Sequence, residues 1–363
     1  MTLNRRTLLA VGATALFARK PALASGGARY LSSAATLPGR YAAVALGEDG
    51  GTSFDLDLPG RGHGLAKRPN SSEAVCFARR AGRFALVLDV RAGEVLTEIS
   101  SASARHFSGH GLFAEAGDLL LATENDEDRH RGVIGIYDAK AGYQRIGEVP
   151  TLGIGPHDLE LMPGGKTLIV ANGGIDKRHD DTSGRDLPDI RSDLVYLDWQ
   201  SGRLLQRVTL DAQFARLSIR HLAMTEAGDV VAALQDSADV PDLDWPLGFL
   251  HRPGGKPRWL ETPPGGWARL RGYCGAAAVD SGAGLIAMSS PRGNCTGLWD
   301  ESGAVLAALH VHDGCGLSAT GAPGQLIISS GSGELFEVSR DAAAPSSLGA
   351  NGEFRFDNHM IRI

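Results

Sequence analysis

A short unit that begins at a histidine or a cysteine recurs seven times and constrains the fold more than any other feature. The unit starts at seven residues: His63, His110, His157, His221, Cys274, Cys315 and His359. Successive starts are 47, 47, 64, 53, 41 and 44 residues apart. Most starts lie next to a glycine, and short apolar segments with glycine-rich turns follow them. Repetition every ~40–50 residues with four strands per unit is typical of a β-propeller. We therefore expect an all-β, seven-bladed β-propeller.

The third unit has the clearest pattern. Residues His157–Leu161 alternate like a half-buried strand, and a Pro-Gly-Gly turn separates them from the apolar segment Thr167–Ala171. After an insertion, Leu194–Asp198 and Leu204–Leu210 predict a third strand and an outer strand. One unit thus supplies the four strands of a blade.

The ends of the propeller region predict how the ring closes. After the last start, His359–Ile363 provides one strand, whereas Tyr41–Leu46 and Ser53–Leu58 precede the first start without an inner partner. Pairing of the C-terminal strand with these N-terminal strands would remove exposed sheet edges. A pair of β-sandwich domains also uses short strands, but it does not explain the repeated starts. Residues 341–352, rich in Ala, Ser and Gly, predict a surface loop.

The first 24 residues resemble an export signal. Arg5 and Arg6 precede an apolar stretch, Ala10–Ala18, and an Ala-Leu-Ala sequence ends at Ala24. This order is typical of twin-arginine signal peptides, and the apolar stretch is too short to span a bilayer. We expect removal of residues 1–24, a single propeller domain over residues 25–363, and a periplasmic protein exported in the folded state.

Charge and cysteine content restrict the partners. The net charge is −6, and removal of residues 1–24 leaves 32 basic and 42 acidic residues, a net charge of −10. Basic residues form no long run, so nucleic acid is excluded as a partner, and we expect no membrane span after signal removal. In an oxidising compartment, Cys76, Cys274, Cys295 and Cys315 allow one or two disulfides, with the pairing open.

The repeated starts are also the candidate ligands. The inner strands of a propeller line its channel, so five histidines and two cysteines would converge there with Asp158, Glu160 and Asp357 nearby. Imidazole, thiolate and carboxylate suit copper, zinc or iron. The alternative is that each histidine hydrogen-bonds to the backbone of its own or the next blade.

Two further segments contain clustered acidic residues. Thr123–Asp128 is either a hard-cation site or a solvated loop, and we expect Glu124 and Asn125 to point into the channel mouth. The insertion Asn172–Asp193 is either a flap over that mouth or a plain mobile insertion. The sequence contains no nucleophile elbow, Walker loop or dinucleotide-binding motif, so no catalytic or cofactor-binding residue is assigned.

These patterns define two sets of candidate site residues. The candidate metal ligands are His110, His157, Asp158, His221, Glu124 and His359. The candidates for the channel mouth or a partner surface are His63, His106, Asn125, Asp126, Asn172, Arg220, Arg292 and Cys315.

Several motifs together resemble a family of twin-arginine-exported proteins known as domain of unknown function 1513. The matching segments are 105–111, 123–126, 131–138, 155–158, 171–175, 218–221, 290–293 and 315–316. The chain departs from the family pattern at Cys274, where an aliphatic residue is usual, and within residues 176–190. The resemblance implies a periplasmic β-propeller whose relatives often occur beside imelysin-type and di-haem-peroxidase-like proteins in iron-responsive gene clusters, but it names no reaction.

Taken together, the sequence predicts a non-catalytic binding protein associated with the acquisition of iron, copper or another transition metal. It would bind the metal, or a periplasmic iron-handling protein, at the channel mouth. The alternatives are a metal-dependent propeller enzyme of the lactonase or quinoprotein-dehydrogenase type, and a pure scaffold.

Overall fold

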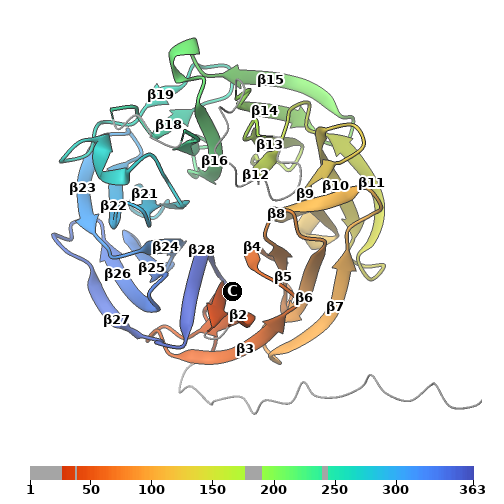
Figure 1. The fold of residues 1–363 in the computed structure, drawn as a ribbon, viewed down its shortest axis with the longest axis horizontal. Coiled ribbons are helices and arrows are strands. Elements are labelled where there is room, and N and C mark those ends of the chain that lie inside the picture. The colour runs from red at the N-terminus through yellow and green to blue at the C-terminus, as the bar shows by residue number, and fades with distance from the viewer. Residues whose placement is uncertain (1–26, 37–38, 176–189, 239–243) are drawn as a thin grey trace, which may run out of the picture.

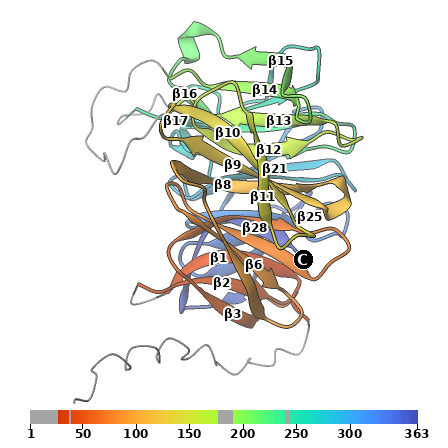
Figure 2. The same ribbon diagram turned by 90° about the vertical axis from the view of Figure 1, so that its right-hand side faces the viewer.

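The fold is a ring of seven antiparallel sheets, each with four strands. The structure, a computed structural model, describes residues 27–36, 39–175, 190–238 and 244–363. Each sheet is one blade, and the blades surround a central channel (Figure 1). In the side view, the inner strands run from one face of the ring to the other (Figure 2). The expected seven-bladed β-propeller is confirmed.

Each blade has an inner, a second, a third and an outer strand. The inner strands are β4 (Gly62–Lys67), β8 (Arg105–Ala114), β12 (Pro156–Leu161), β16 (Leu217–Met224), β20 (Ala276–Asp280), β24 (Gly314–Ala319) and β28 (Phe354–Arg362). The second strands are β5 (Glu73–Ala78), β9 (Leu119–Asp126), β13 (Thr167–Asn172), β17 (Val230–Asp236), β21 (Leu285–Ser290), β25 (Gln325–Ser330) and β1 (Tyr30–Thr36). The third strands are β6 (Phe84–Asp89), β10 (Arg131–Asp138), β14 (Asp193–Asp198), β18 (Gly248–His251), β22 (Cys295–Asp300), β26 (Glu334–Ser339) and β2 (Tyr41–Leu46). The outer strands are β7 (Glu94–Ser100), β11 (Gln144–Pro150), β15 (Arg203–Thr209), β19 (Arg258–Trp259), β23 (Val305–His310), β27 (Ser346–Ala350) and β3 (Thr52–Leu58).

Three short 3₁₀ helices lie in the connections, η1 (Glu115–Gly117), η2 (Ala212–Phe214) and η3 (Trp267–Leu270). Within the described ranges, no helix has the length and apolar character needed to cross a membrane. The predicted signal, residues 1–24, and most of the predicted flap, residues 176–189, lie outside the described residues.

The ring closes through a blade that combines both ends of the propeller. The C-terminal strand β28 pairs with β1, which pairs with β2 and then β3. Closure of the ring by pairing of the C-terminal strand with N-terminal strands is therefore confirmed, and a strand that the sequence did not predict, β1, lies between β28 and β2. The sequence of β1, Tyr-Leu-Ser-Ser-Ala-Ala-Thr, contains mostly small and polar residues and lacks a period-two apolar pattern.

Burial decreases from the second strands to the outer strands. In β5 the side chains of Val75 and Phe77 are fully buried, whereas Val95 and Leu96 on β7 are exposed. The core therefore consists of apolar layers between neighbouring blades, as expected where side chains alternate between the two faces of a sheet. This packing holds the inner strands around the channel.

The expected strands of the third unit match β12 to β15 closely. One other expectation is wrong, because residues 346–350, placed in a surface loop, form the exposed outer strand β27. An outer strand pairs through its backbone on one edge and buries little, so its sequence needs no apolar pattern.

Candidate metal centre

Five consecutive blades place a histidine at the channel. The residues are His359 on β28, His63 on β4, His110 on β8, His157 on β12 and His221 on β16. Each of these strands has a register shift at or close to its histidine. A β-bulge re-aims side chains near it, and here the bulges bring five imidazoles to the axis of the ring.

Glycines beside the histidines allow the inner strands to approach one another. A Cβ atom on Gly64 would lie 2.4 Å from the backbone oxygen of Gly109 and 3.0 Å from Nδ1 of His110. Gly109 has a φ of +107°, and a Cβ atom there would lie 2.7 Å from Cδ2 of His63. Only glycine fits this contact between β4 and β8, which explains the repeated Gly-His-Gly sequence.

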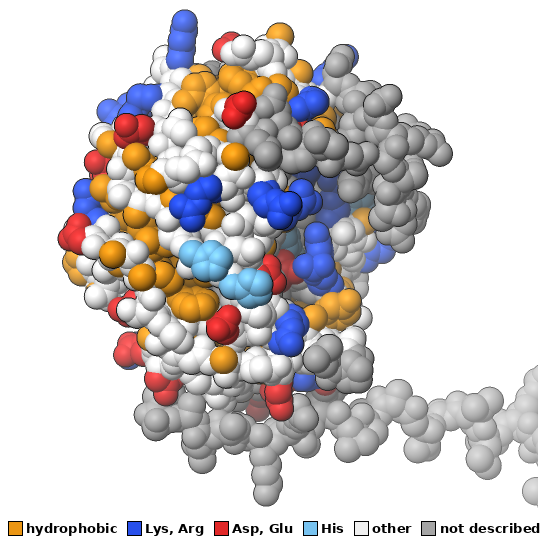
Figure 3. Space-filling view, turned by 60° about the vertical axis from the view of Figure 1, so that its left-hand side comes forward, with side chains coloured by type: hydrophobic (Ala, Val, Ile, Leu, Met, Phe, Trp, Pro, Cys, Tyr) orange, Lys and Arg blue, Asp and Glu red, His pale blue; other side chains and the backbone are white. Residues whose placement is uncertain are grey.

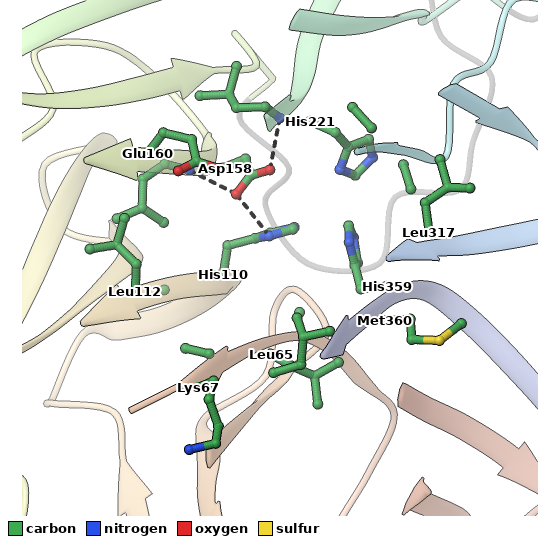
Figure 4. Close-up of a pocket in the computed structure, with 18 of the residues that line it drawn as sticks. Leu65, Lys67, His110, Leu112, Asp158, Glu160, His221, Leu317, His359 and Met360 are labelled. Carbon is green, nitrogen blue, oxygen red and sulfur yellow. Dashed lines mark hydrogen bonds and ion pairs between the residues drawn. The ribbon is translucent and has the colours of Figure 1, made fainter. Parts of the chain in front are cut away.

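The five imidazoles form one cluster. The ring centroids of His63 and His110 lie 5.0 Å apart, those of His110 and His157 4.8 Å, and those of His157 and His221 4.8 Å. His359 lies 4.9 Å from His221 and 4.5 Å from both His63 and His110, again between centroids. Figure 4 shows His110, His221 and His359 pointing toward one another from three different blades.

Acidic side chains orient two of the rings through Nδ1. His63 Nδ1 lies 2.7 Å from the Asp357 carboxylate, which also forms a 2.6 Å ion pair with Arg61. His110 Nδ1 lies 3.1 Å from the Asp158 carboxylate, which accepts a 3.0 Å hydrogen bond from the backbone N–H of Leu222. A carboxylate on Nδ1 favours the tautomer whose Nε2 lone pair is available to a metal.

The opposite ring nitrogens lack protein partners. Nε2 of His110, His157, His221 and His359 is buried, and no described residue hydrogen-bonds to it. In His221, Nδ1 is also buried and has no hydrogen-bond partner among the described residues. None of the five imidazoles bonds to a backbone carbonyl of a described residue, so the geometry differs from the alternative of backbone-bonded histidines. Buried polar atoms without partners are uncommon in folded proteins and point to a missing ligand or water.

Burial favours the neutral form of His63, His157, His221 and His359. It lowers the pKa of His63 despite the neighbouring Asp357, and it lowers the pKa values of His157, His221 and His359 well below 6.5. The charge of Arg220 further lowers the pKa of His157. Neutral imidazole is the form that coordinates metal ions.

Two overlapping sets of three histidines have metal-binding geometry. One set is His63, His110 and His359, the other is His110, His157 and His221, and within each set the ligand atoms lie within 4.8 Å of one another. Three imidazoles suit zinc, copper or iron, and an open fourth position would remain for water or another ligand. His110 belongs to both sets.

A cavity of about 350 Å³ adjoins the cluster. Its lining includes His110, His221, His359 and Asp158, together with Lys67 and Glu160. In Figure 4 the acidic pair lies on one wall, on β12, and Leu317 of β24 lies on another. Burial and the charge of Asp158 raise the pKa of Glu160 to about 8. The cavity therefore combines imidazole nitrogens that can bind a metal, the ammonium group of Lys67 and the carboxyl group of Glu160.

The structure does not bring Glu124 to the histidines. Thr123 bonds the backbone oxygen of His110, and the next side chain on β9 points to the opposite face. Glu124 is fully buried there, where its carboxylate accepts a 2.5 Å bond from Tyr137 and a 2.9 Å bond from Arg145. The prediction of Glu124 as a ligand at the mouth missed this alternation.

The other candidates around Glu124 have partners within their own blade. Asn125 donates a 2.6 Å hydrogen bond to Ser108 Oγ, and Asp126 is buried in a 2.9 Å ion pair with Arg105. His106 Nδ1 lies 3.0 Å from the Glu127 carboxylate. These contacts tie the three side chains to their own blade, although Nε2 of His106 is buried and has no partner among the described residues.

Three further candidates lie in other blades. Asn172 is buried at the end of β13 and donates a 2.8 Å hydrogen bond to Asp193. Arg292 lies over the ring of Tyr273, with its guanidinium carbon 4.4 Å from the ring centroid. Arg220 contacts the cluster directly, since its guanidinium lies 3.5 Å from Nδ1 of His157.

The cysteine starts differ from the histidine starts. All four cysteines are buried, free thiols, so the structure contains neither of the disulfides that the sequence allowed. Sγ of Cys315 donates to the backbone oxygen of Asp313 at 3.1 Å, and Sγ of Cys274 to that of Leu247 at 3.7 Å. Neither belongs to a group with metal-binding geometry in the described residues.

Sequence reasoning missed some functional contacts. It included Asp357 only as a possible ligand, whereas the carboxylate orients His63 from the neighbouring blade. It did not identify Arg61, Lys67 or Gly109. The register shift between Gly62 and Leu65 breaks the alternation of β4, so spacing from His63 could not place Lys67 at the cavity.

Fold and site together define a seven-bladed propeller whose channel carries a cluster of five histidines. The chain matches the family model described as a protein of unknown function (DUF1513) over residues 56–363, and it belongs to that family. No curated protein matches the chain.

One solved structure of similar fold is the hydrazine synthase of Kuenenia stuttgartiensis. The TM-score is 0.60 at 14% sequence identity, and the match covers 83% of this chain and 89% of that chain. At this identity the likeness shows the fold alone.

Proposed function

We propose that the protein binds a transition-metal ion at the five-histidine cluster in its channel. The observation that carries this proposal is the set of buried Nε2 atoms of His110, His157, His221 and His359, which have no partner among the described residues. Leaving a buried polar group unpaired costs about 1–3 kcal/mol each. A metal ion held by the set of His63, His110 and His359 would offset that cost for His110 and His359, whereas donation by Arg220 to Nδ1 of His157 places the proton of that ring on Nε2.

We further propose that this binding serves the acquisition of iron or copper in the periplasm. The twin-arginine pattern at Arg5 and Arg6 supports export of the folded protein. The resemblance to the exported family implies partners among periplasmic iron-handling proteins. In this role the protein is a binding protein, not a catalyst.

A metal-dependent enzyme of the lactonase or quinoprotein-dehydrogenase type is the second candidate. The cavity of about 350 Å³ beside the cluster favours it, because small-molecule sites begin near ~300 Å³. Turnover in a screen of lactones and alcohols, with added calcium or quinone, would support the enzyme. Absence of turnover by metal-loaded protein would count against it.

The decisive experiment is elemental analysis of protein exported in metal-replete medium and purified without chelators or a metal-affinity tag. We expect a near-stoichiometric metal that is lost in the His110→Ala/His157→Ala double variant. The matched control is His310→Ala/His312→Ala, which removes two exposed histidines at and after the end of β23. A folded wild-type protein without metal, and without metal affinity in solution, would refute the proposal.

A further inference from the structure

Arg220 lies beside the histidine cluster, and the described residues provide no carboxylate counter-ion for it. It occupies the register shift of β16, immediately before His221, and its guanidinium donates to Nδ1 of His157 at 3.5 Å. Its Nε is buried and has no hydrogen-bond partner among the described residues. No carboxylate in the described part of the chain forms an ion pair with it.

The position of Arg220 is fixed by close packing. The guanidinium carbon lies 3.5 Å from where a Cβ atom on Gly173 would be, and Ser218 Oγ lies 3.0 Å from the same point. Ser218 donates a 2.7 Å hydrogen bond to the backbone oxygen of Gly173. The side chain therefore lies beside Gly173 at the end of β13, within van der Waals distance of the position of a Cβ atom there.

Further positive charge surrounds Arg220. Burial and the charges of Arg80 and Arg79 lower the pKa of Arg220 to about 10, so it remains charged at neutral pH. Arg80 donates a 2.7 Å hydrogen bond to the backbone oxygen of Ile175. Figure 3 shows Lys and Arg side chains around a hollow in the surface beside the grey residues.

A second arginine approaches from another blade. Arg292 lies over Tyr273, whose hydroxyl accepts a 2.9 Å hydrogen bond from Asn358. Tyr273 is near enough to Arg220 to affect its pKa. Arginines of three blades thus face this end of the channel, while the adjacent imidazoles are neutral.

We propose that this end of the channel binds a small oxyanion, a carboxylate or a phosphate, through the guanidinium of Arg220, with Arg79, Arg80 and Arg292 adding positive charge. A partly buried cation without a carboxylate partner among the described residues is costly, and the planar guanidinium matches two oxygens of such an anion. This inference does not depend on metal binding, because the unpaired charge is present without a metal.

The test is anion binding to folded, chelator-treated protein, measured by isothermal titration calorimetry with citrate and with inorganic phosphate. We expect one of the two to bind, and the one that binds identifies the chemical class. Arg220→Gln should weaken binding by at least about tenfold, the effect of losing a single charge-assisted interaction. Arg220→Lys, which keeps the charge but loses the planar fork, should give an intermediate affinity.

Arg203→Gln is the matched control, because Arg203 is exposed on outer strand β15 and has only a 3.9 Å contact with Asp198. Its anion affinity should equal that of the wild type. Failure of both citrate and phosphate to bind the wild-type protein would overturn the inference, and so would equal affinities of the Arg220→Gln and Arg203→Gln variants. Loss of metal binding alone would refute only the proposed function.

Discussion

The inner strands divide the channel into two unequal parts. Five consecutive strands, from β28 through β16, each present a histidine, whereas the corresponding residues are Cys274, just before β20, and Cys315, in β24, both of them buried free thiols. Strand β20 pairs with β21 in unbroken register from Ala276 to Asp280. The difference shows that position in the repeat alone does not create a ligand. Strand β24 has a register shift between Gly314 and Leu317 but carries a cysteine there, so a bulge alone does not add a member to the histidine cluster.

The first prediction gives the largest effect and concerns His110, which belongs to both ligand sets. His110→Gln should weaken metal binding by more than about 100-fold, beyond the effect of losing an outer-sphere partner. Cys315→Ala, at the equivalent start of β24, should leave the affinity unchanged. Competition with a chromogenic chelator measures both. Equal losses of metal affinity in the two variants would show that the histidine and cysteine positions do not differ in metal binding.

The second prediction concerns the packing of the histidine strands. Gly109→Ala should destabilise the protein by about 2–3 kcal/mol, because it combines a strained φ with overpacking against His63. Gly314→Ala on β24 should cost only about 1 kcal/mol, since the contact is with the side chain of Val311 and its φ is not positive.

Urea denaturation measures both free energies of unfolding. The matched control is Gly147→Ala on β11, where a Cβ atom would meet nothing within 4 Å. Its effect should be within about 0.5 kcal/mol. If Gly109→Ala were as mild as the control, the close approach of β4 and β8 would not be a constraint on the fold.

The third prediction concerns the carboxylate beside His110. Asp158→Asn keeps the shape of the side chain but removes the charge that faces His110 Nδ1, so metal affinity should fall by about tenfold. Asp313→Asn, next to Cys315, should not change it. The readout is metal affinity with unfolding measured in parallel, and an unchanged affinity in Asp158→Asn would show that Asp158 does not tune the ligand.

The fourth prediction gives the smallest effect and concerns the thiols. Burial raises the pKa of Cys76 to about 12 and also raises the pKa values of Cys274, Cys295 and Cys315. Because the thiolate is the reactive form, the native protein should not react with a thiol reagent even at about pH 9, above the usual thiol pKa. Denatured, unreduced protein should react at all four cysteines, and fewer would indicate a disulfide.

The sequence predicted the architecture because the histidine and cysteine starts of the blades recur at a long spacing and because the second strands are apolar. It also predicted the histidines that meet at the channel. It missed β1 and β27, because strands held by backbone pairing need no apolar pattern. It misplaced Glu124, because the direction of a side chain depends on register, and a shift of one residue reverses it. The hydrogen bond between His63 and Asp357 joins two blades, so no local sequence pattern predicts it.

The closing blade has a consequence for biosynthesis. Strands β1 to β3 leave the ribosome early, but the edge of β1 facing the channel is covered only by β28, more than three hundred residues later. Until then the nascent chain carries an unpaired edge that another strand can occupy. His359, the last histidine of the cluster, arrives on that same strand. Ring closure and completion of the histidine cluster therefore occur together, when β28 pairs with β1.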